Sequence, residues 1–244
     1  DAARSRDAVV PDHEIIDLVL LDRMEAGERW VCRHGESGAL PDPASSPLMV
    51  AAVVEGRTIH RSRADLTDQL AEEGQGIGAD RCRDAADYEA DGDPCELLAA
   101  VVGAVTAQRP AALSDADVAL LGGALLEVTV RDAAMALALT VMADEARLLF
   151  AELARRLRDT PRAAAATLVA AGSYLRGDGP LTGIALDAAL TADRHYRGAH
   201  LLAHALAAGM HPRELCITAE IGLDVARRLG VDLPPRDLGF PLAG

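Results

Sequence analysis

The sequence predicts a mainly α-helical protein that begins with a small α/β element. Three observations lead to this fold class. Half of the 244 residues are apolar but only 2% are aromatic, which suits closely spaced helices with small side chains. Through residues 94–230, apolar residues recur at helical spacing between capping residues and glycines. The residues before this region contain short runs rich in Ile, Val and Leu, which predict strands.

Two strands are predicted near the N-terminal end. Residues 14–21 (EIIDLVLL) form the first run, and residues 29–33 (RWVCR) can pair back against it as a hairpin with a longish loop. Residues 35–46, which contain two prolines, are expected to form a loop.

Two short helices complete the predicted α/β element. The first begins at Pro47 and ends at Gly56, in agreement with the preference for proline at helix starts and glycine at helix ends. The second follows a cap at Ser62 and ends near Glu72. We therefore assign residues 1–72 to the small α/β element.

Residues 73–93 (EGQGIGADRCRDAADYEADGD) are rich in glycine and acidic residues and poor in apolar ones. This composition predicts a linker and a domain boundary. The run Gly74–Gly78 could suggest a phosphate-binding loop, but no strand precedes it and no lysine follows. Flexibility is therefore the preferred explanation for these glycines.

The second domain is predicted to be helical throughout. Asp93 caps a helix over residues 94–108, Ser114 caps the next, and Gly209 and Gly230 occupy positions typical of helix C-terminal caps. The other predicted segments are helices at about 131–141, 143–158, 162–176, 180–192, 195–208 and 213–229, in a helical-hairpin domain of residues 94–230, and a tail of residues 231–244.

A weak internal repeat suggests how these helices are arranged. Ala146 and Phe150 are followed about 36 positions later by Thr182 and Leu186, close to the 34-residue period of tetratricopeptide repeats. The proline that closes such a repeat is replaced by Arg194. The helices therefore form either a tetratricopeptide-like array or an ordinary bundle.

Charge and composition limit the classes of partner. The formal net charge of −14 opposes binding to nucleic acid and to anionic lipid. The longest nearly uncharged runs are shorter than the ~18 residues of a membrane-spanning helix.

The absence of lysine and asparagine indicates a GC-rich, bacterial genome. Four cysteines without close pairs suit a reducing cytoplasm: Cys32, Cys82, Cys95 and Cys216.

Two groups of residues are candidates for chemistry. Cys32 and His34 would share one face of a strand, so a Cys–His nucleophile pair is one hypothesis and a packed cysteine the other. His200 and His204 lie one helical turn apart, as metal ligands can. No third potential ligand occurs at a spacing typical of a metal site, so two solvated histidines are the alternative interpretation. No cofactor is expected.

A series of short motifs extends from about residue 14 to residue 212, and its order is more specific than any single motif. Among its members are Asp17–Leu20, Gly27–Cys32, Val130–Ala134 and Leu175–Gly179. In this order the motifs resemble an actinobacterial family known as domain of unknown function 4192. The resemblance implies lineage, fold and a cytoplasmic setting, and no reaction. Members usually carry a further α/β half upstream, so it also implies a fragment or a shortened member. A Cys-Cys-Pro group typical of the family is replaced here by residues 34–41.

These observations favour a non-enzymatic scaffold or protein-interaction module in the cytoplasm. Its expected partner is another protein, or the missing N-terminal half, with Trp30 as an interaction residue. The first alternative is an enzyme of unknown class with a site between the strand hairpin and the helices, drawing on Trp30, Cys32, His34 or His60. The second alternative is a metal-binding protein that uses His200 and His204.

Overall fold

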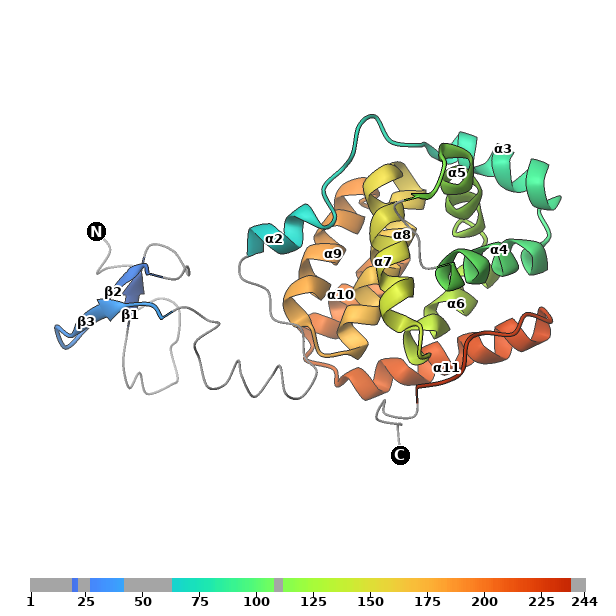
Figure 1. The fold of residues 1–244 in the computed structure, drawn as a ribbon. Helices are drawn as coiled ribbons and strands as arrows, with labels where there is room; N and C mark the ends of the chain where they lie inside the picture. Colours follow the sequence, from blue (N-terminus) through green and yellow to red (C-terminus); the bar gives the residue numbers. More distant parts are fainter. Residues whose placement is uncertain (1–18, 22–26, 42–62, 108–111, 238–244) are drawn as a thin grey trace. The chain divides into compact units, whose positions relative to one another are not determined.

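The computed structural model describes residues 19–21, 27–41, 63–107 and 112–237. It confirms the predicted fold class, because helices predominate and a small antiparallel sheet precedes them (Figure 1). The chain divides into two compact units, residues 1–62 and residues 63–244. The predicted helix at 47–56 and the candidate His60 lie outside the described residues.

The first unit contains a three-stranded antiparallel sheet in the order β1-β2-β3. The strands are β1 (Val19–Leu21), β2 (Arg29–Cys32) and β3 (Ser37–Ala39). Val19 pairs with Cys32, so the predicted hairpin between the first two strands is confirmed.

The third strand lies where a loop was expected. Trp30 of β2 pairs with Gly38 of β3, and a Cβ atom at position 38 would lie 2.9 Å from the Trp30 ring. A glycine is therefore needed for the indole to lie across the strand. The sequence Ser-Gly-Ala contains no β-branched or aromatic residue, which is why the pattern gave no strand signal here.

The second unit is a set of packed helices. They are α2 (Arg63–Asp68), α3 (Ala79–Ala90), α4 (Pro94–Thr106), α5 (Asp115–Ala124), α6 (Val128–Met135), the 3-10 helix η3 (Ala136–Leu139), α7 (Ala143–Arg156), α8 (Asp159–Leu175), α9 (Gly179–Ala192), α10 (Arg197–Ala207) and α11 (Pro212–Arg228). None of the helices in the described part of the chain combines the length and apolar character that a membrane crossing requires.

Helix α8 is the centre of this unit. Every residue from 161 to 171 is buried, and a helix that is buried on all sides lies in the core of its domain. Helices α7, α8 and α9 run side by side (Figure 1), and α8 also contacts α3, α5, α6 and α11. In a tetratricopeptide array each repeat contacts its sequence neighbours. The arrangement therefore matches the bundle alternative, and a tetratricopeptide-like array is not confirmed.

The local signals for helix ends are confirmed where the structure describes them. The side chain of Asp93 accepts a hydrogen bond from the backbone N–H of Cys95 at the start of α4, and Ser114 caps α5. Gly209 and Gly230 have φ angles of 64° and 73° after α10 and α11, a left-handed conformation that favours glycine.

The structure differs from the linker predicted at residues 73–93, because residues 79–90 form α3 and pack against α5. The buried face of α3 consists of Cys82, Ala86 and Ala90, small residues that give a weak apolar signal. Two adjacent glycines of α5 allow the helices to approach closely, and a Cβ atom at Gly123 would lie 2.2 Å from the carbonyl oxygen of Cys82. The boundary between units accordingly falls between residues 62 and 63.

Helix α11 packs closely on α6, and the segment after α11 forms backbone hydrogen bonds at the end of η3. A Cβ atom at Gly222 would lie 2.4 Å from the carbonyl oxygen of Asp132 in α6, so the two helices are in close contact. The chain then turns back, where the backbone N–H of Val141 donates to the carbonyl oxygen of Pro235 (2.9 Å). The N–H of Asp237 donates to the carbonyl oxygen of Leu139 (3.0 Å).

Candidate functional site

A polar pocket opens in the helical unit between the start of α5, the end of α7 and the segment that leads into α3. Its volume is about 660 Å³, within the range of small-ligand sites. The described residues that line it are Glu73, Gln75, Gly76, Ile77, Arg81, Leu113, Asp115, Glu152 and Arg156.

One wall of the pocket is built by the glycine-rich segment that was expected to be merely flexible. The N–H of Ile77 donates to the carbonyl oxygen of Arg156 (2.8 Å). The N–H of Arg158 donates to the carbonyl oxygen of Ile77 (3.0 Å). Gly76 has a φ of +62°, and a Cβ atom there would lie 3.3 Å from the Cβ of Arg158. Glycine is therefore required to bring this segment against the end of α7.

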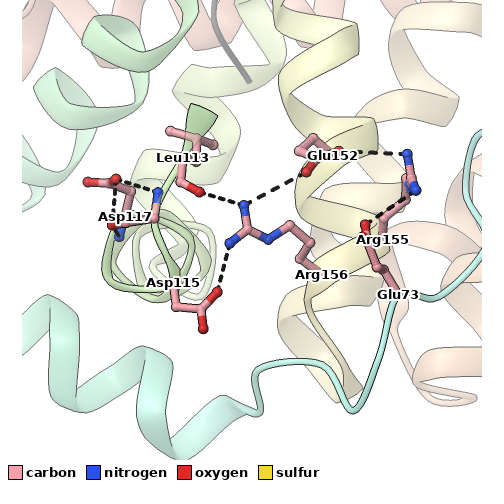
Figure 2. A network of polar contacts seen from close by, with 8 residues as sticks. Glu73, Leu113, Asp115, Asp117, Glu152, Arg155 and Arg156 are labelled. Atoms are coloured by element: carbon pink, nitrogen blue, oxygen red, sulfur yellow. Dashed lines mark hydrogen bonds and ion pairs between the residues drawn. The ribbon is translucent and has the colours of Figure 1, made fainter. Parts of the chain in front are cut away.

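Arg156 joins the two helices that frame the pocket. Its Nη1 donates to the carbonyl oxygen of Leu113 (2.7 Å) and its Nη2 donates to Oδ1 of Asp115 (2.7 Å). Figure 2 shows the guanidinium reaching from α7 across to these two acceptors at the start of α5. The side chain is 18% exposed, so the planar guanidinium acts as a partly buried cross-link between α7 and α5.

Glu152 lies between two arginines of the same helix. Its carboxylate oxygens are 3.9 Å from Nη1 of Arg155 and 3.8 Å from Nη1 of Arg156, distances of ion pairs rather than hydrogen bonds. The Glu152 side chain is 17% exposed, and its carboxylate accepts no hydrogen bond from the described residues. Arg155 also pairs with Glu73 across the pocket rim (3.3 Å).

The start of α5 is fixed by a reciprocal cap. The hydroxyl and the N–H of Ser114 both donate to Oδ2 of Asp117 (2.7 and 2.8 Å), and the N–H of Asp117 donates to Oγ of Ser114 (3.2 Å). These hydrogen bonds from Ser114 hold the pKa of Asp117 below its ordinary value of 3.8, with a smaller contribution from Arg156. The cap thereby holds Asp115 and Leu113 in place for Arg156.

Removal of this cap should have a pH-dependent effect. We expect Ser114→Ala to lower the free energy of unfolding at pH 7 by about 1 kcal/mol. Because the folded pKa of Asp117 is lowered, its contribution is present above pH 3.8 and is lost as the pH falls through the folded value. The difference in free energy of unfolding between wild type and Ser114→Ala should therefore become smaller as the pH is lowered. Urea unfolding from pH 7 downward measures it, and a difference of constant width would contradict the role assigned to Asp117.

The cysteine and histidine candidates of the first unit are not arranged as expected. Strand β2 ends at Cys32, and His34 lies in the turn beyond it, exposed to solvent. Buried Cys32 accepts a hydrogen bond from the backbone N–H of His34 through Sγ (3.3 Å). The thiol thus meets a backbone amide rather than the imidazole, and a catalytic role for either residue stays a prediction, as does an interaction role for Trp30.

The two candidate metal ligands lie one turn apart on α10, and both are exposed. Nε2 of His200 is 2.8 Å from the carbonyl oxygen of Arg194, so this nitrogen is occupied as a donor. Within the ranges that the structure covers, no group of three or more His, Cys, Asp or Glu residues is placed to hold a metal ion. A two-ligand site at His200 and His204 stays a prediction.

Little about the pocket could be predicted from local sequence patterns. Arg155 and Arg156 occur in a basic run that predicts a solvated helix face, whereas Arg156 is in fact mostly buried. Its hydrogen-bond partners precede it by 43 and 41 residues. No local pattern relates residues at such separations, and the only local signal is the pair of adjacent arginines in the last turn of α7.

Comparison with known proteins identifies the family to which the chain is related. A family model described as "Domain of unknown function (DUF4192)" matches residues 2–213, a range that includes the sheet and all described pocket residues. No curated protein and no solved structure matches the chain. The match covers most of the 244 residues, and the chain therefore belongs to the DUF4192 family.

Proposed function

We propose that the helical unit is a non-enzymatic binding module, and that its polar pocket receives a basic side chain from another protein. The observation that supports this most directly is the carboxylate of Glu152, which is 17% exposed and accepts no hydrogen bond from the described residues. The other two carboxylates of the lining, those of Glu73 and Asp115, already accept hydrogen bonds from Arg155 and Arg156.

The guanidinium of Arg156 already has acceptors within the protein. Arg156 donates to two acceptors of the protein, whereas Glu152 has only ion pairs of 3.8 and 3.9 Å. A partly buried carboxylate gains most from donors at close hydrogen-bond distance. A guanidinium or ammonium group of a partner supplies such donors beside Glu152.

The residues at the rim of the pocket can bind the main chain of an extended peptide. Arg81 and Gln75 are exposed and can donate to backbone carbonyl groups of a bound peptide, while Ile77 and Leu113 supply apolar surface. The net charge of −14 draws basic partners toward the protein and disfavours nucleic acid and anionic lipid surfaces as partners.

The residue types around the pocket favour binding over nucleophilic catalysis. The lining side chains that the structure describes include no Ser, Thr, Cys, Lys or His, which leaves the three carboxylates as the groups of that lining able to act as a base or a nucleophile. The four cysteines are free, in keeping with the reducing cytoplasm proposed as the setting.

A small-molecule titration tests this function without a known partner. We expect N-acetyl-arginine amide to shift the amide NMR signals of Ile77 and Asp115, and N-acetyl-glutamate amide to leave them unchanged. Glu152→Gln should weaken the arginine complex about tenfold, the cost of one charged hydrogen bond. Glu145→Gln, on the same helix but outside the pocket lining, is the matched control and should bind as wild type does.

Three results would overturn the proposal. The arginine amide could leave the signals of the pocket residues unchanged, or the glutamate amide could bind there equally well or better. The third is an equal loss of binding in the Glu152 and Glu145 variants, which would mean that the general charge of the helix, rather than the pocket, attracts the cation.

A further inference from the structure

Helix α11 has one buried face and one apolar face that nothing in the described chain covers. The buried face consists of small residues that pack on α6, η3 and α8. On the opposite side, Ile217 and Ile221 are 55% and 56% exposed. Residues four apart are neighbours on a helix surface, so the two side chains form one apolar stripe. Figure 1 shows α11 along the border of the helical unit.

Two opposite charges lie at the ends of this stripe. At about 100° per residue, Glu214, Ile217, Ile221 and Arg228 fall within roughly 60° of one another around the helix axis. Neither Glu214 nor Arg228 forms an ion pair with a described residue. Other charges of α11 do, since Asp224 pairs with its neighbour Arg227, and Glu220 pairs with Arg236 of the following segment. The outer face therefore presents an acidic end, an apolar centre and a basic end.

We propose that a second copy of the chain covers this face, through antiparallel packing of two α11 helices about a two-fold axis at Ile221. A two-fold interface must be complementary to itself. In this register Ile221 meets Ile221, Ile217 meets Val225, and Glu214 meets Arg228 twice. The interface thus joins three apolar contacts around Ile221 to two ion pairs at its ends.

Neighbouring arrangements are less complementary. A register centred between Ile217 and Ile221 places Glu214 opposite Asp224, which sets two like charges against each other. Parallel packing places Glu214 opposite Glu214 and Arg228 opposite Arg228. Like-charge juxtaposition is unfavourable across an interface, so the charges select the antiparallel register about Ile221.

The short helix sets the strength of the interaction. The 17 residues of α11 span about 25 Å at 1.5 Å per residue, and so small an interface belongs to the weak, reversible class. We expect a monomer–dimer equilibrium with a dissociation constant in the micromolar range. This interface uses none of the pocket residues, so the dimer and the proposed binding function stand or fall separately.

Sedimentation velocity on the full chain, from about 1 to about 500 µM, tests the dimer. The average mass should rise with concentration in wild type and stay monomeric in Ile221→Glu. Leu201→Glu is the matched control, because Leu201 is 70% exposed on α10 and outside the proposed interface; it should dimerise as wild type does. Circular dichroism establishes that each variant is folded.

A charge exchange tests the register. Glu214→Arg and Arg228→Glu should each weaken the dimer at least about fivefold, since each sets like charges opposite one another. The double variant restores opposite charges and should recover most of the wild-type affinity. The proposal is overturned by a wild type that is monomeric at every concentration, by an Ile221→Glu dimer of unchanged strength, or by a double variant that fails to recover.

Discussion

Gly123→Ala should lower the free energy of unfolding of the helical unit by about 2–3 kcal/mol. The added Cβ atom would lie 2.2 Å from the carbonyl oxygen of Cys82 and 2.7 Å from the Cβ of Ala86. The nearest atom belongs to the backbone of α3, so the clash cannot be relieved by rotating a side chain. Helices α3 and α5 must move apart, and the small apolar contacts between them are lost.

Urea unfolding followed by circular dichroism measures this change, and Gly103→Ala is the matched control. Gly103 lies in α4, is exposed and has no atom within 4 Å of an added Cβ. Alanine there should leave stability unchanged or raise it by up to about 1 kcal/mol, because it is the better helix former. Equal effects of the two substitutions would contradict the close approach of α3 and α5.

A second measurement follows from the buried thiol at the same contact. Burial raises the pKa of Cys82 to about 11, so the thiol should react slowly with alkylating reagents at neutral pH. Separation of α3 from α5 in the Gly123 variant should therefore accelerate alkylation of Cys82 as well as lower stability. Mass spectrometry of the labelled peptide distinguishes Cys82 from the more exposed Cys95.

Arg162→Met should cost about 3 kcal/mol of stability. The Arg162 side chain is 7% exposed, its Nη2 donates to the carbonyl oxygen of Leu70 (2.9 Å), and its Nη1 donates to that of Ala154. These bonds tie α8 both to the end of α7 and to the turn after α2. Methionine has similar length but no donor, so two carbonyl groups would lose their bonds from this side chain.

The ion pair of Arg162 with Glu72 should matter much less than these two hydrogen bonds. The Glu72 side chain is 60% exposed and its Oε1 lies 3.4 Å from Nε of Arg162, the situation in which a salt bridge contributes little. We expect Glu72→Gln to change stability by less than about 0.5 kcal/mol. Denaturant unfolding of both variants makes the comparison, and a larger loss in the Glu72 variant would reverse this assignment.

The helices that could be predicted are those whose signals are local. Asp93 and Ser114 at helix starts, and Gly209 and Gly230 at helix ends, act within a few residues of themselves. A local pattern is sufficient to recognise them. The same signals place most of α4 to α11 within a few residues of their observed bounds.

Most of the features that could not be predicted depend on distant residues. Helix α3 has only Cys and Ala on its buried face, and its burial depends on glycines of α5 some forty residues later. The strand at Gly38 depends on the ring of Trp30. The pocket exists because Arg156 reaches Leu113 and Asp115. For α3 and the pocket the decisive partner lies about forty residues away, outside the window of a local pattern. At Gly38 the partner is near in sequence, but the segment contains no β-branched or aromatic residue that would indicate a strand.

The contacts of α11 with α6 and η3 affect the stage of translation at which the helical unit can fold. Helix α6 and η3 leave the ribosome well before α11 and the segment that pairs with Leu139 and Val141. A domain generally folds as a unit, so the apolar cluster around Leu139 and Leu175 cannot be completed until Cys216 and Ala219 have been synthesised. The synthesis of α11 therefore decides when the helical unit can complete its core.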